Sequence, residues 1–187
     1  MDYSIIKERN QIDPADTWAI EDLYATDDCW EQEFALLEDD KNALASYAGK
    51  LGSGAEQLLG FLELTEKTTV RISKLGNYCM RKADEDTSNS KYQGMAGKFM
   101  TMAVTLRAVT SFDTPEIMAI EEDVLEGFYK ECPELERYRR YLTDMRRRKA
   151  HTLSPVEEKL LAAAGEMAQA PDNVYGLFAD ADLTFAD

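Results

Sequence analysis

The sequence has few of the residues that form catalytic centres: it holds one histidine, His151, and three cysteines among 187 residues. A zinc hydrolase of the H-E-x-x-H type needs two histidines one helical turn apart, and a Ser-His-Asp or Cys-His mechanism pairs its histidine with a nucleophile. A lone loop histidine is more often structural than catalytic. We therefore expect no catalytic residue, no metal site and no cofactor in this chain.

Long apolar runs and disulfide patterns are also missing. No uncharged run exceeds eight residues, whereas a membrane-spanning helix needs about 20 apolar residues. The first nine residues mix both charges and lack the apolar stretch of a signal peptide. Cys29, Cys79 and Cys132 lie 50 or more residues apart and form no C-x-x-C pair, which is typical of reduced thiols. These features predict a cytoplasmic protein without a membrane partner.

Positive charge is scarce, with 21 Lys and Arg against 36 Asp and Glu and a formal net charge of -15. Nucleic acid is a poor partner, because neutralising phosphates requires clustered cations. The hydrophobic share of 44%, with 10% aromatics, is ample for a packed core in a chain of this length. We expect one soluble helical domain over residues 1–187.

Apolar residues recur at steps of three and four along most of the chain, which predicts helices. Turn residues separate the predicted helical segments, which are 27–48, 53–82, a third that follows the cap at 84–89 and ends near 112, a broken stretch over 115–131, 133–149, 154–168 and 172–179. Residues 182–185 alternate polar and apolar side chains instead, as a strand does. The expected fold class is all-α: an antiparallel bundle of about five to seven helices with a short C-terminal strand segment cut off.

Several local features refine this prediction. Ser53 and Glu56 have the spacing of a capping box. Gly49 is typical of the residue that ends a helix, and Thr114 before Pro115 is typical of a helix N-cap. The spacing of the large aromatic residues predicts core positions. Those residues are Trp18, Trp30 and Phe34.

Two clusters invite a functional interpretation. Asp84, Asp86 and Ser88 alternate like the start of a calcium loop, but Asn89 and Met95 stand where such a loop needs Gly and Glu. We expect a solvated turn that caps the next helix.

The second cluster is basic. Residues 137–149 carry seven cations against one anion. We expect these cations to offset the negative charge of neighbouring carboxylates, and an interdomain docking surface is the alternative.

A series of short motifs occurs in a fixed order along the whole chain. The motifs are Thr17-Trp18 with Asp22-Leu23-Tyr24, Trp30, Tyr78, Asp84 to Asn89 with Tyr92-Gln93, Pro115-Glu116-Ile117, His151 to Ser154 with Glu157-Glu158 and Leu160-Leu161, and Ala181-Asp182-Leu183 with Phe185. This ordered series resembles the N-terminal region of the oligoendopeptidase F family of zinc metallopeptidases. The resemblance departs from the family pattern at Ala19, Asp180 and Thr184.

The resemblance implies a helical lobe whose parent is a cytoplasmic peptidase that cleaves oligopeptides inside a closed channel. It implies zinc in a separate catalytic domain, which would be the partner of this lobe in cis or in trans. Two other interpretations stay open: a free-standing helical module that binds peptides or proteins, and one chain of a split peptidase.

The resemblance also marks residues as family-signature positions, with structural jobs such as capping helices. These are Trp18, Asp84, Asp86, Thr87, Asn89, Tyr92, His151 and Thr152. A catalytic lobe would dock on an exposed apolar patch near the end of the sequence. We expect that patch at Leu177, Phe178, Leu183 and Phe185.

Overall fold

A computed structural model describes residues 11–86, 88–147, 171 and 174–175. The chain divides into two compact units, Met1–Arg146 and Arg147–Asp187, and the single domain over residues 1–187 stays a prediction. Between residues 11 and 147 the described residues form six α-helices and three short 3-10 helices. Their bounds are η2 Pro14–Asp16, η3 Ile20–Asp22, α1 Asp27–Ala45, α2 Ala55–Glu85, α3 Ser90–Val109, α4 Asp113–Ala119, α5 Glu122–Glu131, η4 Pro133–Tyr138 and α6 Arg139–Arg147.

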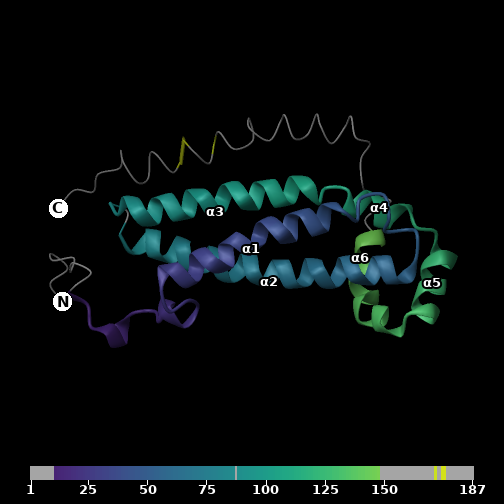
Figure 1. Ribbon diagram of the computed structural model, residues 1–187, viewed down its shortest axis with the longest axis horizontal. Coiled ribbons are helices and arrows are strands. Elements are labelled where there is room, and N and C mark those ends of the chain that lie inside the picture. The colour runs from purple at the N-terminus through teal and green to yellow at the C-terminus, as the bar shows by residue number, and fades with distance from the viewer. Residues whose placement is uncertain (1–10, 87, 148–170, 172–173, 176–187) are drawn as a thin grey trace. The chain divides into compact units, whose positions relative to one another are not determined.

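The predicted all-α class is confirmed. The three long helices α1, α2 and α3 lie side by side, and each contacts the other two, while α4, α5 and α6 gather at one end of them (Figure 1). No strand occurs among the residues that the structure describes. The predicted strand at 182–185 and the predicted helix at 154–168 lie outside those residues.

The ends of α1 and α2 follow from side-chain and glycine chemistry. Thr26 caps α1 by accepting a hydrogen bond from the Cys29 amide at 3.2 Å. After α1, Gly49 adopts a φ of 77°, which glycine reaches without steric cost. The predicted capping box at Ser53 is wrong: Gly54 is the N-cap of α2, and the Ser53 hydroxyl donates to the Lys50 carbonyl at 2.7 Å instead.

The core lies between the long helices and contains most of the predicted apolar stripe. Trp30 is 0% exposed, stacks on Phe34 at a ring-centroid distance of 4.9 Å, and donates its Nε1–H to the Leu75 carbonyl at 2.9 Å. That hydrogen bond satisfies the one polar group of a buried indole. The core positions predicted for Trp30 and Phe34 are therefore confirmed.

A buried ion pair joins α1 to α2 at mid-length. Arg71 on α2 donates from its Nε to Glu33 at 2.6 Å and from a terminal nitrogen to Asp40, both on α1. The side chains of Arg71 and Asp40 are 11% and 9% exposed. Burial disfavours the charged guanidinium, but the hydrogen bonds and charges of the two carboxylates outweigh it and raise the pKa of Arg71.

The chain after α3 folds back on the α1–α2 turn. The predicted cap at Thr114 is wrong, because α4 begins one residue earlier, at Asp113, without a side-chain cap. The carboxylate of Glu116 on α4 instead accepts hydrogen bonds from the Gly49 amide at 2.5 Å and the Leu51 amide at 3.2 Å. These bonds fix a turn that is distant from α4 in the sequence.

The basic segment pairs with acidic side chains, as expected. Arg137 lies 3.3 Å from both Glu63 and Glu66 on α2. Arg139 pairs with Glu126 and Glu136 and covers the ring of Tyr129 at 3.8 Å from its centroid, and Arg146 pairs with Glu122 at 2.9 Å. The cations up to Arg146 therefore belong to the fold of the first unit, and residues 148–149 lie outside the described part.

Candidate functional site

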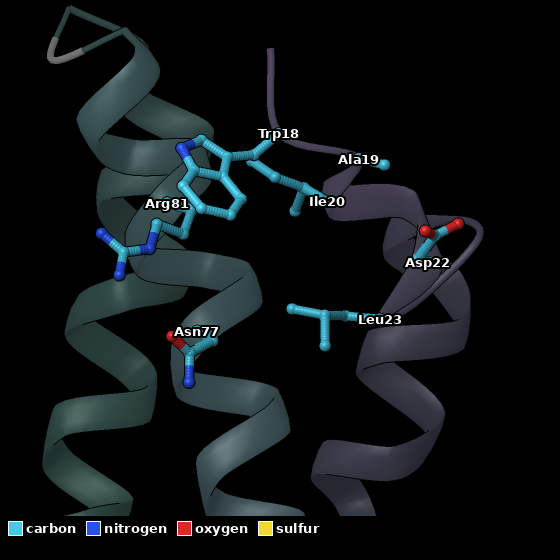
Figure 2. A pocket seen from close by; sticks show the side chains of 7 residues that line it. All are labelled: Trp18, Ala19, Ile20, Asp22, Leu23, Asn77 and Arg81. Carbon is cyan, nitrogen blue, oxygen red and sulfur yellow. The ribbon is translucent and has the colours of Figure 1, made fainter.

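A surface hollow lies between the segment that precedes α1 and the C-terminal half of α2. Its volume is about 340 Å³. Figure 2 shows Trp18 and Ile20 on one side of it, Leu23 on another, and Asn77 and Arg81 on α2. The other lining residues are Ala19 and Asp22. An apolar hollow with few polar groups has the usual composition of a ligand site.

Trp18 is the residue that corrects the sequence prediction most strongly. We expected it in the core, but its side chain is 85% exposed. In this segment the buried side chain is instead that of Ile20, which is 5% exposed. The backbone there forms only a short 3-10 helix with no side-chain cap. The indole is left on the surface as one wall of the hollow (Figure 2).

A polar network joins α1, α2 and α3 at the same end of the bundle. Asp27 in the first turn of α1 accepts hydrogen bonds from the Tyr78 hydroxyl at 2.7 Å and from Lys91 at 2.5 Å. The Lys82 ammonium lies 5.8 Å from the ring centroids of both Tyr78 and Tyr92. Sequence reasoning missed Asp27 because its partners are on other helices, far from it along the chain.

This network shifts two pKa values in opposite directions. Burial raises the pKa of Tyr78, and the Asp27 carboxylate, which accepts its proton, raises it further. Burial also disfavours the charged form of Asp27, but the hydrogen bonds from Lys91 and Tyr78 outweigh that effect and lower the pKa of this carboxyl. The pair is therefore fixed as a phenol donating to a carboxylate at neutral pH.

Four of the predicted signature residues lie, in the sequence, near the end of α2 or between α2 and α3. Asp84 is exposed near the end of α2, and Asp86 Oδ1 accepts hydrogen bonds from the Ser88 amide and hydroxyl at 3.0 and 2.6 Å. Asn89 caps α3 by accepting from the Lys91 amide at 3.2 Å, so the predicted cap is confirmed. Thr87, the fourth, is outside the described residues.

Two more signature residues lie near this turn. Tyr92 is the third residue of α3, in its first turn. Trp18 borders the hollow together with Arg81, which lies in the last turns of α2. The remaining predicted residues, His151, Thr152 and the docking patch, fall outside the described part of the chain, so their roles stay predictions. The patch consists of Leu177, Phe178, Leu183 and Phe185.

The described residues offer little catalytic chemistry. They contain no group of three or more His, Cys, Asp or Glu side chains arranged to hold a metal ion. All three cysteines are free thiols, as expected, and burial raises the pKa of Cys79 to about 11, which makes it a poor nucleophile at neutral pH. No helix in the described ranges is long and apolar enough to cross a membrane.

Sequence reasoning also missed a pair of adjoining hollows on α2, because no motif marks them. One, of about 400 Å³, lies against Tyr138 and Tyr141, and the other, of about 230 Å³, lies against α3. Thr65 and Thr69 line both hollows. The hydroxyls of Thr65 and Thr68 are buried without a hydrogen-bond partner among the described residues, so this surface has unused hydrogen-bonding capacity.

Comparison with known proteins identifies relatives that are much longer than this chain. The family model described as Oligopeptidase F, a model of an N-terminal peptidase domain, matches residues 116–185. Oligopeptidase PepF from Bacillus subtilis is 33% identical over 180 residues, which make up 96% of this chain and 27% of the relative. The plasmid oligoendopeptidase F from Lactococcus lactis is 33% identical over 95% of this chain and 30% of its own length.

Solved structures agree with these matches. The crystal structure of oligoendopeptidase F from Enterococcus faecium superposes with a TM-score of 0.64 at 28% identity, covering 86% of this chain and 32% of that protein. A Chlamydophila abortus protein shares the fold with a TM-score of 0.72 at 24% identity, covering 97% of this chain and 31% of its own. This chain is therefore similar, over nearly its whole length, to the N-terminal helical domain of the oligoendopeptidase F family.

Proposed function

We propose that this chain is the N-terminal, non-catalytic lobe of a zinc metalloendopeptidase that hydrolyses oligopeptides, and that it forms part of the wall of the substrate channel. One observation carries the proposal: the similarity takes up 96% of this chain but 27% of the Bacillus relative. A larger part of such an enzyme therefore remains to supply the catalytic chemistry.

The residues of this chain do not fit a zinc site of the H-E-x-x-H type. That site needs two histidines, and the whole sequence has one. The proposal accordingly assigns the zinc and the catalytic residues to a separate peptidase domain, joined in cis or in trans. It includes a cytoplasmic location, the environment in which three free thiols persist.

The packing supports the role of a wall. A wall has to keep its shape while peptides pass. The three long helices share a core, α1 and α2 are joined by polar bonds at one end and at mid-length, and at the other end Glu116 joins α4 to the α1–α2 turn. Each of these bonds connects residues that are more than 30 positions apart in the sequence. A lobe held in this way keeps its form without a bound ligand.

The test compares three proteins in the hydrolysis of a fluorogenic oligopeptide with zinc present: the complete gene product, residues 1–187 alone, and the product without residues 1–187. The intact mass of the complete product is measured first, against the 21.1 kDa of this chain. We expect a heavier product and peptidase activity that requires the part beyond this chain.

Two results would contradict the proposal. One is peptide hydrolysis by purified residues 1–187 with zinc, free of contaminating peptidase. The other is a gene product no heavier than this chain that copurifies with no peptidase chain, which would favour a free-standing binding module. A product of that same mass that copurifies with a histidine-rich peptidase would support the trans form.

A further inference from the structure

The hollow beside Trp18 combines an apolar wall with a cation that has no ion pair among the described residues. We propose that it is a binding site for the C-terminal residue of a peptide, with a large apolar side chain against Trp18 and the terminal carboxylate at Arg81. This inference goes beyond the proposed function and does not depend on it, because it rests on the geometry and chemistry of the hollow.

The apolar wall is unusual for a free surface. Trp18 is 85% exposed and Leu23 37% exposed, and both border the hollow with Ile20. A tryptophan side chain is normally well buried, and covering it removes a large apolar area from water. Figure 2 shows the indole standing beside α2, next to the Arg81 side chain. An apolar group that enters the hollow therefore gains contact on several sides.

The polar side of the hollow is suited to an anion. Among the described residues Arg81 has no carboxylate partner, although Asp and Glu outnumber Lys and Arg in the chain by 36 to 21. The acidic lining residue, Asp22, directs its carboxylate away from the hollow (Figure 2). The Arg81 guanidinium lies at the outer edge of the hollow and points away from Ile20 and Leu23 (Figure 2), and its forked N–H groups can bind a carboxylate there.

Asn77 supplies the third contact. Its Nδ2 donates to the Ser73 carbonyl at 2.8 Å, which leaves the Oδ1 atom as an acceptor on the wall of the hollow. Asn77 and Arg81 are four residues apart and therefore share one face of α2. An N–H donor and a carboxylate that approach α2 together would meet an acceptor and a cation one helical turn apart.

These three contacts select one kind of occupant. In a peptide, only the C-terminal residue carries a backbone N–H, a carboxylate and a side chain on the same carbon atom. The volume of about 340 Å³ lies at the lower end of the range for small-ligand sites, which suits one large residue. Leu, Met or Phe at the end of a peptide fits this combination of apolar surface, acceptor and cation.

Tryptophan fluorescence of the 187-residue chain tests the site directly. The chain has two tryptophans, and Trp30 is fully buried, so a ligand in the hollow changes the emission of Trp18. We expect acetyl-Ala-Ala-Leu with a free carboxylate to shift the emission to shorter wavelength in a saturable way. The Trp18→Phe variant should lose this response and keep the emission of Trp30.

Arg81→Gln should weaken binding about threefold, the effect of an exposed ion pair. Arg107→Gln is the matched control, because Arg107 is also an exposed arginine without an ion pair among the described residues but lies on α3, away from the hollow. It should bind the peptide like the unaltered chain.

Three outcomes would overturn the inference. They are the absence of a saturable response to the free acid, equal binding of the C-terminal amide of the same peptide, and equal binding of acetyl-Ala-Glu-Leu-amide, whose carboxylate is on a side chain. Each leaves the peptidase assay of the complete gene product unaffected, so the two proposals fail separately.

Discussion

At Gly76 the separation of two helices depends on one missing methyl group. A Cβ at this position would lie 2.7 and 2.9 Å from ring atoms of Phe99 on α3. Real side chains do not approach so closely, and both residues are buried between α2 and α3. Gly76 is therefore required because its contact with Phe99 leaves no room for a side chain, and not because its backbone conformation demands glycine.

Gly76→Ala should lower the free energy of unfolding by about 1–3 kcal/mol, the usual cost of overpacking a core. Gly97→Ala is the control, because a Cβ there meets nothing within 4 Å. It should raise stability by about 0.5–1 kcal/mol through helix propensity alone. Urea unfolding followed by circular dichroism measures both values, and equal effects of the two substitutions would contradict the close contact.

Asp27 makes a pH-dependent contribution to stability. The pKa of its carboxyl is lowered in the folded chain, so its contribution is complete above the unfolded value of about 3.9 and is lost as the pH falls through the folded value. Asp27→Asn should therefore cost about 1 kcal/mol at pH 7 and much less at pH 2. Thermal unfolding at both pH values checks this, and a cost that does not change with pH would refute it.

At the scale of elements, the α1–α2 turn and α4 stabilise each other through Glu116. Removing its carboxylate leaves the Gly49 and Leu51 amides without their partner. Glu116→Ala should cost about 1.5–3 kcal/mol, as expected for hydrogen bonds to a charged group. Glu121 borders the same surface hollow as Glu116 and Gly49 but makes no side-chain cap bond, so Glu121→Ala should change stability by less than about 0.5 kcal/mol. Urea unfolding distinguishes the two.

The contact between α1 and α2 depends on Arg71 in a different way. Arg71→Met removes one partner of a buried pair and should cost about 3–5 kcal/mol, because Asp40 is then buried without its cation. Adding Asp40→Leu should recover a large part of this loss. A double-mutant cycle by chemical denaturation measures the recovery, and strictly additive effects would show that the pair does not interact.

The patterns read from the sequence were most reliable for elements. The spacing of Trp30 and Phe34 placed α1 correctly, because helix periodicity and burial are the same property of a stripe of apolar side chains. Helix starts were predicted well where a local side chain caps them, as at Thr26 and Asn89. They failed at Ser53 and Thr114, where the hydroxyl-bearing residue does not provide the cap.

At the scale of the whole molecule, α6 completes the hydrophobic core of the first unit. Leu142 on α6 is 0% exposed and belongs to the same buried cluster as Trp30. We expect a chain of residues 1–147 to unfold in a single cooperative transition, whereas residues 1–138, without α6, should lose much of that stability. Circular dichroism during urea unfolding compares them, and a non-cooperative transition for residues 1–147 would contradict the independence of the first unit.

The sequence by itself determined the helical class, the main helix boundaries, the free thiols and the resemblance to oligoendopeptidase F, because these follow from periodicity, composition and ordered motifs along one chain. Only the tertiary structure decided that Trp18 is exposed while Trp30 is buried, and that Asp27, Glu116 and Arg71 bind partners on distant parts of the chain. The physical reason is that local patterns fix which face of a helix is apolar. Which other element covers that face depends on how the helices pack together.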